Sequence, residues 1–404
     1  MTATRRLQRI VATTDFHSAF DSAVPMLAHL HAARHDSLVV DCGDFFEGTG
    51  YYRLGHGRIE RDVLVRLYDA IAPGNHGWAH YFEPELHRIT VCANTVDDRT
   101  SKPLFHPLQL VRIGMRRVAV TGIIGPQAFN AIPAEQRAGH RVVEPVRALR
   151  ELLLAHHHEA DSWVVLSHSG FDEDLKLAEA CPFLDVVFAG HCHSEQPKPV
   201  HVGDTLVLKG PELATGYALA QPLGTVWAAQ VADFPPAAEL PDELASLRGS
   251  IVSCRDELQT SLGPLRPPYR SSPLDRRALL KELVDRLHGG LGAEVVVLNE
   301  TALRATRLGT TLSQGDLLAI EPFDNELVHA HVPDELATAP GALLARLTEA
   351  AGPIVSAPHP LPARVPTVLT TGYLATAYLG GRTRQAGLRL AQAVRHTLTD
   401  GDPR

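Results

Sequence analysis

Short apolar runs recur through the first 210 residues and alternate with polar or amphipathic segments. The runs are RIVATT, SLVVDC, RRVAVTGII, SWVVLS, DVVFAG and TLVLKG. Continuous Val, Ile and Leu runs of this length are typical of strands buried on both faces, as in layered α/β proteins. Between them, AFDSAVPMLAHLHAARH and EPVRALRELLLAHHHEA have the spacing of amphipathic helices. The pattern therefore predicts an α/β domain.

The pattern changes between about residues 233 and 275. The proline-rich stretches FPPAAELPDELASL and LGPLRPPYRSSPLD flank one helical segment, which is typical of a connection between domains. After it, a helix over 275–288, the strand AEVVVLN and a closing strand PTVLTTGYLA indicate a second, smaller unit. We expect a catalytic domain over 1–232, a connection with a short helix over 233–274, and a smaller α/β domain over 275–404.

Composition and charge limit the partners of this chain. It has 404 residues, 45% hydrophobic and 21% charged, as an ordinary soluble globular protein does. The net charge of -8 argues against a nucleic acid or a membrane surface as the main partner. No apolar stretch reaches about 18 residues, the start lacks the apolar segment of a signal peptide, and the five cysteines lack CxxC spacing. We therefore expect a cytoplasmic protein that acts on a small molecule.

Polar residues follow five of the apolar runs, at or just after the point where each run ends. They are Asp15 and His17 in TTDFH, Asp44 in DCGDFFEG, Asn75 and His76 in PGNH, His168 in LSHSG, and His191 and His193 in AGHCH. Open α/β sheets bind their ligands beyond the carboxyl ends of the strands, so we expect these side chains to converge. The run His156–His158 instead closes a helix, where histidine suits the helix dipole, and we expect it to be structural.

These residues are enough to hold two divalent metal ions. Two carboxylates, one amide oxygen and four imidazoles are available besides His76, and Asp44 has two oxygens that can bridge ions about 3.5–4 Å apart. A neutral Asn75 leaves a net positive centre, which attracts a phosphoryl group. The mixture of nitrogen and oxygen ligands favours Zn, Mn, Fe or Co over Mg or Ca. Each residue alone could be structural, whereas the ordered set of five clusters predicts a metal centre.

The same motifs carry a resemblance to a known family. TTDFH, GDFFEG, GNH, CANTVDD, LSHSG and AGHCHS resemble the metallophosphoesterase (calcineurin-like) family, and GAEVVVLNETALR and IEPFDNELV resemble its 5'-nucleotidase/UDP-sugar hydrolase branch. The resemblance implies a four-layer α/β/β/α sandwich followed by a smaller, shortened α/β domain that binds substrate. It also implies that one metal is held by Asp15, His17, Asp44 and His193, and the other by Asp44, Asn75, His168 and His191.

The resemblance assigns a catalytic role to His76. It matches the family histidine that faces the substrate and stabilises the phosphoryl oxygens or protonates the leaving alkoxide. We expect the preceding glycine, Gly74, to allow a sharp turn before Asn75. In many relatives an aspartate three residues after the histidine orients its ring, and here that position is Ala79. The nearest polar replacements along the sequence are His80, Glu83 and Glu85.

Four residues of the second domain match substrate-binding positions of the family. Asn299 and Arg304 keep the five-residue offset of the relatives, and Phe323 and Tyr373 match the two aromatics that stack on a base. The aspartate that binds the ribose hydroxyls in relatives corresponds to about Leu379, so ribose binding differs here. From the residues alone, without the resemblance, we would expect Phe323 and Tyr373 to be core aromatics and Arg304 to be a surface arginine.

The sequence therefore predicts a dimetal phosphomonoester hydrolase. The substrate we expect is a nucleoside 5'-monophosphate or a related small phosphorylated metabolite. The alternatives are a UDP-sugar diphosphatase, a 2',3'-cyclic phosphodiesterase and a phosphatase for a specialised non-nucleotide ester. A protein of another class, which kept the fold and binds without catalysis, is less compatible with seven retained ligand residues.

Overall fold

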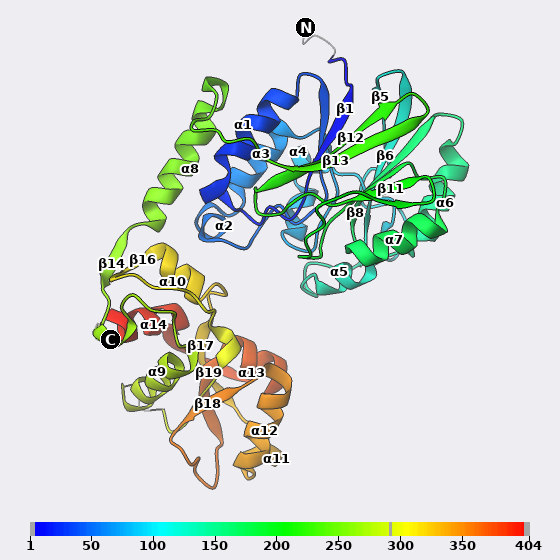
Figure 1. The fold of residues 1–404 in the computed structure, drawn as a ribbon. Coiled ribbons are helices and arrows are strands. Elements are labelled where there is room, and N and C mark those ends of the chain that lie inside the picture. The colour runs from blue at the N-terminus through cyan, green and yellow to red at the C-terminus, as the bar shows by residue number, and fades with distance from the viewer. Residues whose placement is uncertain (1–4, 291–292, 400–404) are drawn as a thin grey trace. The chain divides into compact units, whose positions relative to one another are not determined.

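A computed structural model describes residues 5–290 and 293–399 of the chain (Figure 1). The chain forms two compact units, Met1–Cys254 and Arg255–Arg404. Each unit has its own β-structure and its own hydrophobic core.

The first unit contains two large sheets. One has the strand order β13-β12-β1-β2-β3, and its strands are β1 (Arg9–Thr13), β2 (Ser37–Asp41), β3 (Ala70–Ile71), β12 (Gly216–Leu223) and β13 (Val226–Asp233). The other has the order β10-β11-β9-β8-β6-β5, and its strands are β5 (Gln109–Ile113), β6 (Arg116–Ile124), β8 (Ser162–His168), β9 (Val186–Ala189), β10 (Val200–Val202) and β11 (Thr205–Leu208). The pairs β1–β2, β2–β3, β6–β8 and β8–β9 are parallel, so the carboxyl ends of these strands lie at one edge of each sheet.

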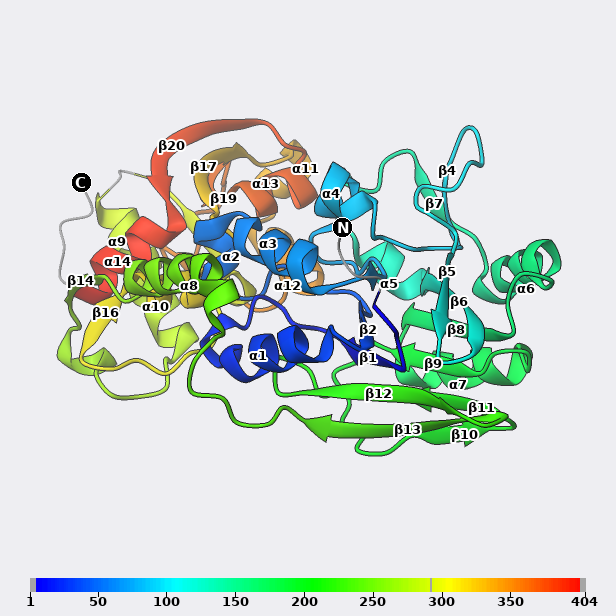
Figure 2. The same cartoon turned by 90° about the horizontal axis from the view of Figure 1, so that it is seen from above.

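The two sheets pack face to face, because one core cluster draws apolar residues from both, such as Val40 of β2 and Val164 of β8. The helices α1 (Val24–Ala33) and α3 (Arg58–Leu67) lie on one side of the unit, and α6 (Pro145–His156) and α7 (Phe171–Ala180) lie on the opposite side (Figure 1 and Figure 2). A separate cluster packs α6 and α7 against the outer face of the second sheet. The predicted four-layer α/β/β/α arrangement is confirmed.

Each of the six apolar runs forms a strand, and the two amphipathic segments contain α1 and α6. The structure adds strands that have no such run. β13 is an edge strand with several exposed positions, and the last residues of β12 are also exposed, so neither reads as a continuous apolar segment. A small pair, β4 (Thr95–Asp97) and β7 (His140–Val142), and the short helices α2 (Gly50–Gly55), α4 (Pro84–His87) and α5 (Pro126–Ala131) complete the unit.

The range 233–274, expected to connect the domains, holds the helix α8 (Ala245–Leu258) and the strand β14 (Ser261–Pro264). Buried residues toward the end of this range, Leu265, Tyr269 and Leu274, pack in the core of the second unit. β14 pairs with β16 (Thr311–Ser313), which lies before α10 (Gln314–Ile320).

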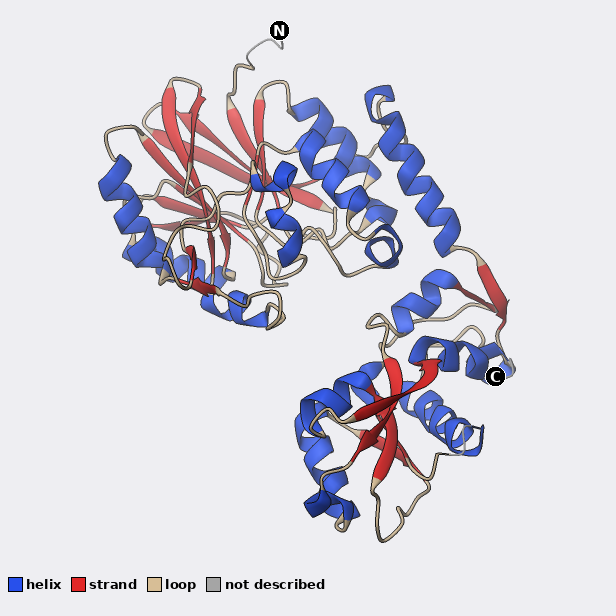
Figure 3. Cartoon of the chain, turned by 180° about the vertical axis from the view of Figure 1, so that it is seen from behind, coloured by secondary structure: helices blue, strands red, loops and turns tan. Residues whose placement is uncertain are grey.

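The second unit is built on one five-stranded sheet with helices on both faces (Figure 3). The order is β18-β15-β19-β17-β20, with bounds β15 (Val296–Asn299), β17 (Glu326–His331), β18 (Ile354–Ala357), β19 (Thr367–Thr371) and β20 (Thr383–Arg389). Val296 and Leu298 pack on the side of α9 (Arg276–Gly290) and α14 (Leu390–Thr399). Val295 and Val297 pack on the side of α11 (Asp334–Ala337), α12 (Pro340–Ala351) and α13 (Gly372–Tyr378). Among the described helices, none combines the length and apolar character needed to span a membrane.

The predicted closing strand over PTVLTTGYLA was wrong in its second half. β19 ends at Thr371, whose hydroxyl accepts a hydrogen bond from the Leu374 backbone N–H at 3.2 Å and caps α13. Tyr373 therefore lies in the first turn of a helix. The chain also continues through β20 and α14 after this strand.

Candidate active site

Loops from both sheets of the first unit meet at the carboxyl ends of β1, β2, β3, β8 and β9, and hydrogen bonds connect them. The His191 backbone N–H donates to the Asp15 carboxylate, 3.1 Å from Oδ2, which links the two sheets. The His76 backbone N–H donates to Asp44 Oδ1 at 2.8 Å, and the His17 N–H donates to the Asp44 carbonyl at 3.0 Å. The five predicted clusters therefore lie at one site.

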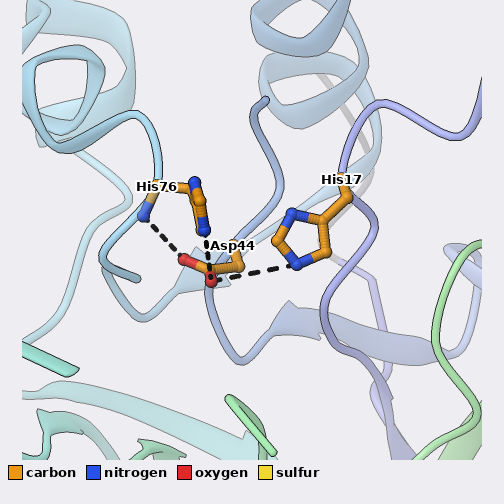
Figure 4. A group of neighbouring side chains, drawn as sticks. All are labelled: His17, Asp44 and His76. Carbon is orange, nitrogen blue, oxygen red and sulfur yellow. Dashed lines mark hydrogen bonds and ion pairs between the residues drawn. The ribbon is translucent and has the colours of Figure 1, made fainter. Parts of the chain in front are cut away.

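His17, Asp44 and His76 form the first group of close side chains (Figure 4). Asp44 Oδ2 lies 3.9 Å from His17 Nε2 and 3.9 Å from His76 Nε2. His17 Nε2 is also 4.0 Å from Asp15 Oδ1. The ligand atoms of the three residues lie within 4.8 Å of one another, so one metal ion can contact them together.

Asp44, His168 and His191 form the second group. His168 Nε2 lies 3.3 Å from Asp44 Oδ2 and 3.2 Å from the side-chain oxygen of Asn75. The other ring nitrogen of His168, Nδ1, lies 2.8 Å from the Cys42 carbonyl and donates its hydrogen there. Asp44 belongs to both groups, as a carboxylate that bridges two ions must.

Two observations indicate that these side chains suit a pair of metal ions. His17 Nε2 is buried and has no hydrogen-bond partner among the described residues, although it faces two carboxylates. Because His168 Nδ1–H is donated to a carbonyl, Nε2 is the ring nitrogen that faces the oxygens of Asn75 and Asp44, and a cation bound there can replace a proton on Nε2. Nitrogen and oxygen atoms that converge in this way suit a bound cation.

The electrostatics of the site favour an anionic Asp44. Burial works to raise the pKa of Asp44, but His168, His76 and His17 outweigh it and hold the pKa well below its usual range. Burial lowers the pKa of His168, yet the charge and hydrogen bond of Asp44 overcome this and raise it to about 9. Each shift shows that the carboxylate and the imidazole stabilise opposite charges across about 3 Å.

The backbone is strained where the ligands lie. Four predicted ligands have positive φ angles, a conformation that side chains other than glycine adopt rarely: Asp15 (49°), His17 (49°), Asp44 (55°) and His191 (75°). Such residues cost of order 1–3 kcal/mol each and concentrate at functional sites. The fold therefore tolerates this backbone strain, which directs these four side chains toward the same site.

Gly74 is required for a reason other than the expected turn. It is absent from the described residues with positive φ, so conformational freedom does not explain it. A Cβ at this position would lie 2.1 Å from Asp44 Oδ1 and 2.2 Å from the Asp44 backbone nitrogen. The glycine allows the loop after β3 to approach Asp44 closely.

Asp15 and His193, which are also predicted ligands, belong to neither of these two groups. Asp15 is fully buried, and its carboxylate accepts hydrogen bonds from His191 N–H and from the Thr14 hydroxyl. The His193 side chain is 62% exposed, with its ring 5.7 Å from that of His17. Its Nδ1 lies 2.6 Å from Glu212 Oε2, so this carboxylate orients the ring and leaves Nε2 without a side-chain partner in this contact.

The carboxylate that contacts His76 is Glu47, which sequence reasoning missed. His76 Nδ1 lies 2.9 Å from Glu47 Oε2, and this hydrogen bond, with the charge of Asp44, raises the pKa of His76. Of the expected replacements, Glu83 contacts His80, with 2.6 Å between Oε1 and Nδ1. Glu47 lies in GDFFEG, the motif that supplies Asp44, but far in sequence from His76, so no sequence signal indicates the contact.

The predicted substrate residues lie on several elements of the second unit. Phe323 and Tyr373 are 48% and 54% exposed, which is not the placement of core aromatics. The Arg304 guanidinium lies 5.0 Å from the centre of the Phe323 ring, while the Tyr373 hydroxyl lies 3.1 Å from that of Tyr378. Asn299 is buried, and its amide donates to the Thr301 hydroxyl.

Comparison with known proteins agrees with the fold. Residues 8–195 match the calcineurin-like phosphoesterase family. The chain therefore contains a calcineurin-like metallophosphoesterase domain, which carries all the predicted ligands.

The individual relatives are distant. The chain is 26% identical over 204 residues to the uncharacterised metallophosphoesterase YunD of Bacillus subtilis, covering 46% of this chain and 43% of that protein. It is 24% identical over 181 residues to the snake venom 5'-nucleotidase of Naja atra, covering 42% of this chain and 34% of that protein. The chain thus spans less than half the length of either.

A solved structure extends the likeness to both units. The 5'-nucleotidase precursor of Thermus thermophilus superposes with a TM-score of 0.65 at 19% identity, covering 97% of this chain and 96% of that one. At this identity the likeness concerns the fold, which is that of an α/β domain followed by a smaller α/β domain.

Proposed function

We propose that this protein hydrolyses phosphoesters with two divalent metal ions. The proposal rests on one observation: the Asp44 carboxylate is shared by two groups of imidazoles, where loops from the two sheets meet. The residues that would hold the ions are Asp15, His17, Asp44 and His193 for one, and Asp44, Asn75, His168 and His191 for the other. When bound, such ions act as Lewis acids and lower the pKa of a water. The nitrogen and oxygen ligands favour Zn, Mn, Fe or Co.

The residues of the site suit a phosphoryl group. Asn75 contributes a neutral oxygen, so only Asp15 and Asp44 offset the charge of two divalent ions, and the centre attracts a dianion. Because Glu47 occupies Nδ1 of His76, Nε2 is the ring nitrogen that remains for the substrate. A proton held at Nε2 stabilises the charge that develops on the phosphoryl and leaving oxygens.

The finer proposal is that the substrate is a nucleoside 5'-monophosphate. Phe323 and Tyr373 expose large aromatic rings, and stacking on a base gives such rings a use. Arg304 supports the Phe323 ring from its face, and a relative of the first domain is described as a 5'-nucleotidase. We infer that these two aromatics bind the base, and we keep Asn299 as a predicted substrate residue.

A second candidate is a phosphatase for a specialised non-nucleotide ester. Leu379, at the position where relatives have the aspartate for the ribose, is 3% exposed and packs in the core of the second unit. It has no polar group to offer a sugar, so a nucleotide would lack that contact.

Phosphate release from a panel of esters tests both candidates. The chain is stripped with a chelator, reloaded with Mn or Zn, and given nucleoside 5'-monophosphates, a UDP-sugar, a 2',3'-cyclic nucleotide, sugar phosphates and a generic aryl phosphate. We expect metal-dependent release, with the highest kcat/KM for a nucleoside 5'-monophosphate. Release from other esters but from no nucleotide favours the second candidate, and no release from any ester by the metal-loaded chain contradicts the proposal.

Removing the ring of Phe323 or of Tyr373 shows whether these aromatics bind a base or stabilise the fold. Stacking contributes about 1–3 kcal/mol, so Phe323→Ala and Tyr373→Ala should raise KM for a nucleotide by about 5- to 150-fold and leave a short alkyl phosphate unaffected. Tyr373→Phe is the matched control, because it keeps the ring and removes only the hydroxyl that contacts Tyr378. Equal losses on the nucleotide and the alkyl ester would show that the rings stabilise the fold.

A further inference from the structure

The orienting aspartate of the relatives is replaced here by Ala79, an exposed residue without a polar side chain. We propose that Glu47 is the positioning residue for His76: its carboxylate fixes the ring with hydrogen on Nδ1 and Nε2 toward the site. This inference rests on the proposed function, in which His76 assists departure of the leaving group.

Both oxygens of Glu47 hold the segment that carries His76. Oε2 lies 2.9 Å from His76 Nδ1, and Oε1 accepts the Gly77 backbone N–H at 3.0 Å. One carboxylate therefore forms hydrogen bonds with both the ring and the next peptide group, which restricts rotation of the imidazole. A surface glutamate that met the ring by chance would not use its second oxygen on the same segment.

The backbone is arranged for this contact. Glu47 has a φ of 64°, a conformation that glutamate adopts rarely. Gly77 has a φ of 67°, and a Cβ there would lie 2.5 Å from Phe46 Cβ, so the two loops touch at this point. The loop after β2 thus supplies Asp44 to the metals and, three residues later, Glu47 to the histidine.

The other carboxylates near His76 are committed elsewhere. Glu83 contacts His80 and also accepts from Arg61 at 2.9 Å. Glu85 is exposed, and Asp44 faces the opposite nitrogen of the His76 ring at 3.9 Å. Among the described residues, Glu47 is the carboxylate within hydrogen-bond distance of Nδ1.

The contact determines which nitrogen works on the substrate. An ionised carboxylate only accepts hydrogen bonds, so it keeps hydrogen on Nδ1. Nε2 is then the atom that carries a proton to the leaving oxygen as the phosphorus–oxygen bond breaks, and the ring is left neutral in the same tautomer. Without Glu47, the ring loses the contact that keeps Nε2 directed into the site, and the imidazolium that donates the proton loses its partner carboxylate.

Glu47→Gln tests the inference, because a glutamine amide of the same size can donate to Nδ1 and so reverse the tautomer. We expect metal content and KM to stay the same and kcat to fall about 10- to 100-fold. The fall should be larger for an alkyl phosphate, whose leaving oxygen needs the proton, than for an aryl phosphate with a good leaving group. Glu83→Gln, the same change on the carboxylate of His80, is the control and should leave kcat unchanged.

An unchanged kcat in Glu47→Gln, or an equal fall on both esters, would overturn the positioning role. If the unmutated chain hydrolyses no ester, the proposed function is wrong, but the positioning role of Glu47 can still be tested by a measurement that does not need turnover. Nitrogen NMR of the metal-free protein, at a pH where the ring is neutral, should show hydrogen on Nδ1 of His76, assigned by its loss in His76→Gln. In Glu47→Gln the hydrogen should move to Nε2, and the same tautomer in both proteins would refute the inference.

Discussion

Asp44→Asn should remove bound metal and lower phosphoester turnover by several orders of magnitude. Asp44 Oδ2 lies 3.9 Å from His17 Nε2 and 3.3 Å from His168 Nε2, so it is the ligand atom common to both proposed ions. An amide removes the negative charge and replaces one carboxylate oxygen with an NH2 group that does not bind a metal ion. Elemental analysis of the purified variant, with turnover of an aryl phosphate, measures both effects.

Asp41→Asn is the matched control for that experiment. Asp41 is the last residue of β2, the strand that precedes Asp44. Burial raises the pKa of Asp41 to about 8, so a neutral amide resembles the side chain at neutral pH. Its oxygens accept hydrogen bonds from the Thr13 hydroxyl and the Gly43 N–H, and Asp41 belongs to neither group of close side chains. Metal and activity should survive in Asp41→Asn, and full metal content with normal turnover in Asp44→Asn would rule out the dimetal mechanism.

His76→Ala should keep both ions and lower kcat by about 10²- to 10⁴-fold, the range of a general acid. The reason is geometric, since Glu47 holds Nδ1 and leaves Nε2 for the substrate, on a side chain that is 42% exposed. The measurement is metal content together with kcat for one ester that the unmutated chain hydrolyses.

The outcome that would correct this assignment is loss of an ion in His76→Ala. His76 Nε2 is close enough to His17 and Asp44 to act as a ligand of the first ion, and the experiment decides between the two roles. His157→Ala, an exposed histidine just after α6, controls for general effects of removing an imidazole and should change neither quantity.

The fold could be predicted wherever a segment is buried on both faces. Val, Ile and Leu runs such as β6 and β8 are recognisable because nearly every position faces a core. β13 could not be found in this way, since it lies at a sheet edge and many of its side chains meet solvent. The end of β19 was missed because a single hydroxyl, that of Thr371, starts a helix within an apolar sequence.

The site could be predicted as far as it follows the ends of strands. Asp44, His168 and His191 are read from the sequence because each comes at or directly after a strand, and parallel strands bring those ends together. Glu47 could not be found, because its contact with His76 depends on a left-handed backbone and on the approach of two loops. Gly74 was identified, but only the structure shows that Asp44 leaves no space for a side chain.

The most direct test of the dimetal centre is anomalous scattering from crystals of the unmutated protein grown or soaked with Mn²⁺. The account predicts two peaks about 3.5–4 Å apart with Asp44 between them. One should lie against His17 and His193, and the other against Asn75, His168 and His191. A single peak, or two peaks that do not share Asp44, would contradict the account.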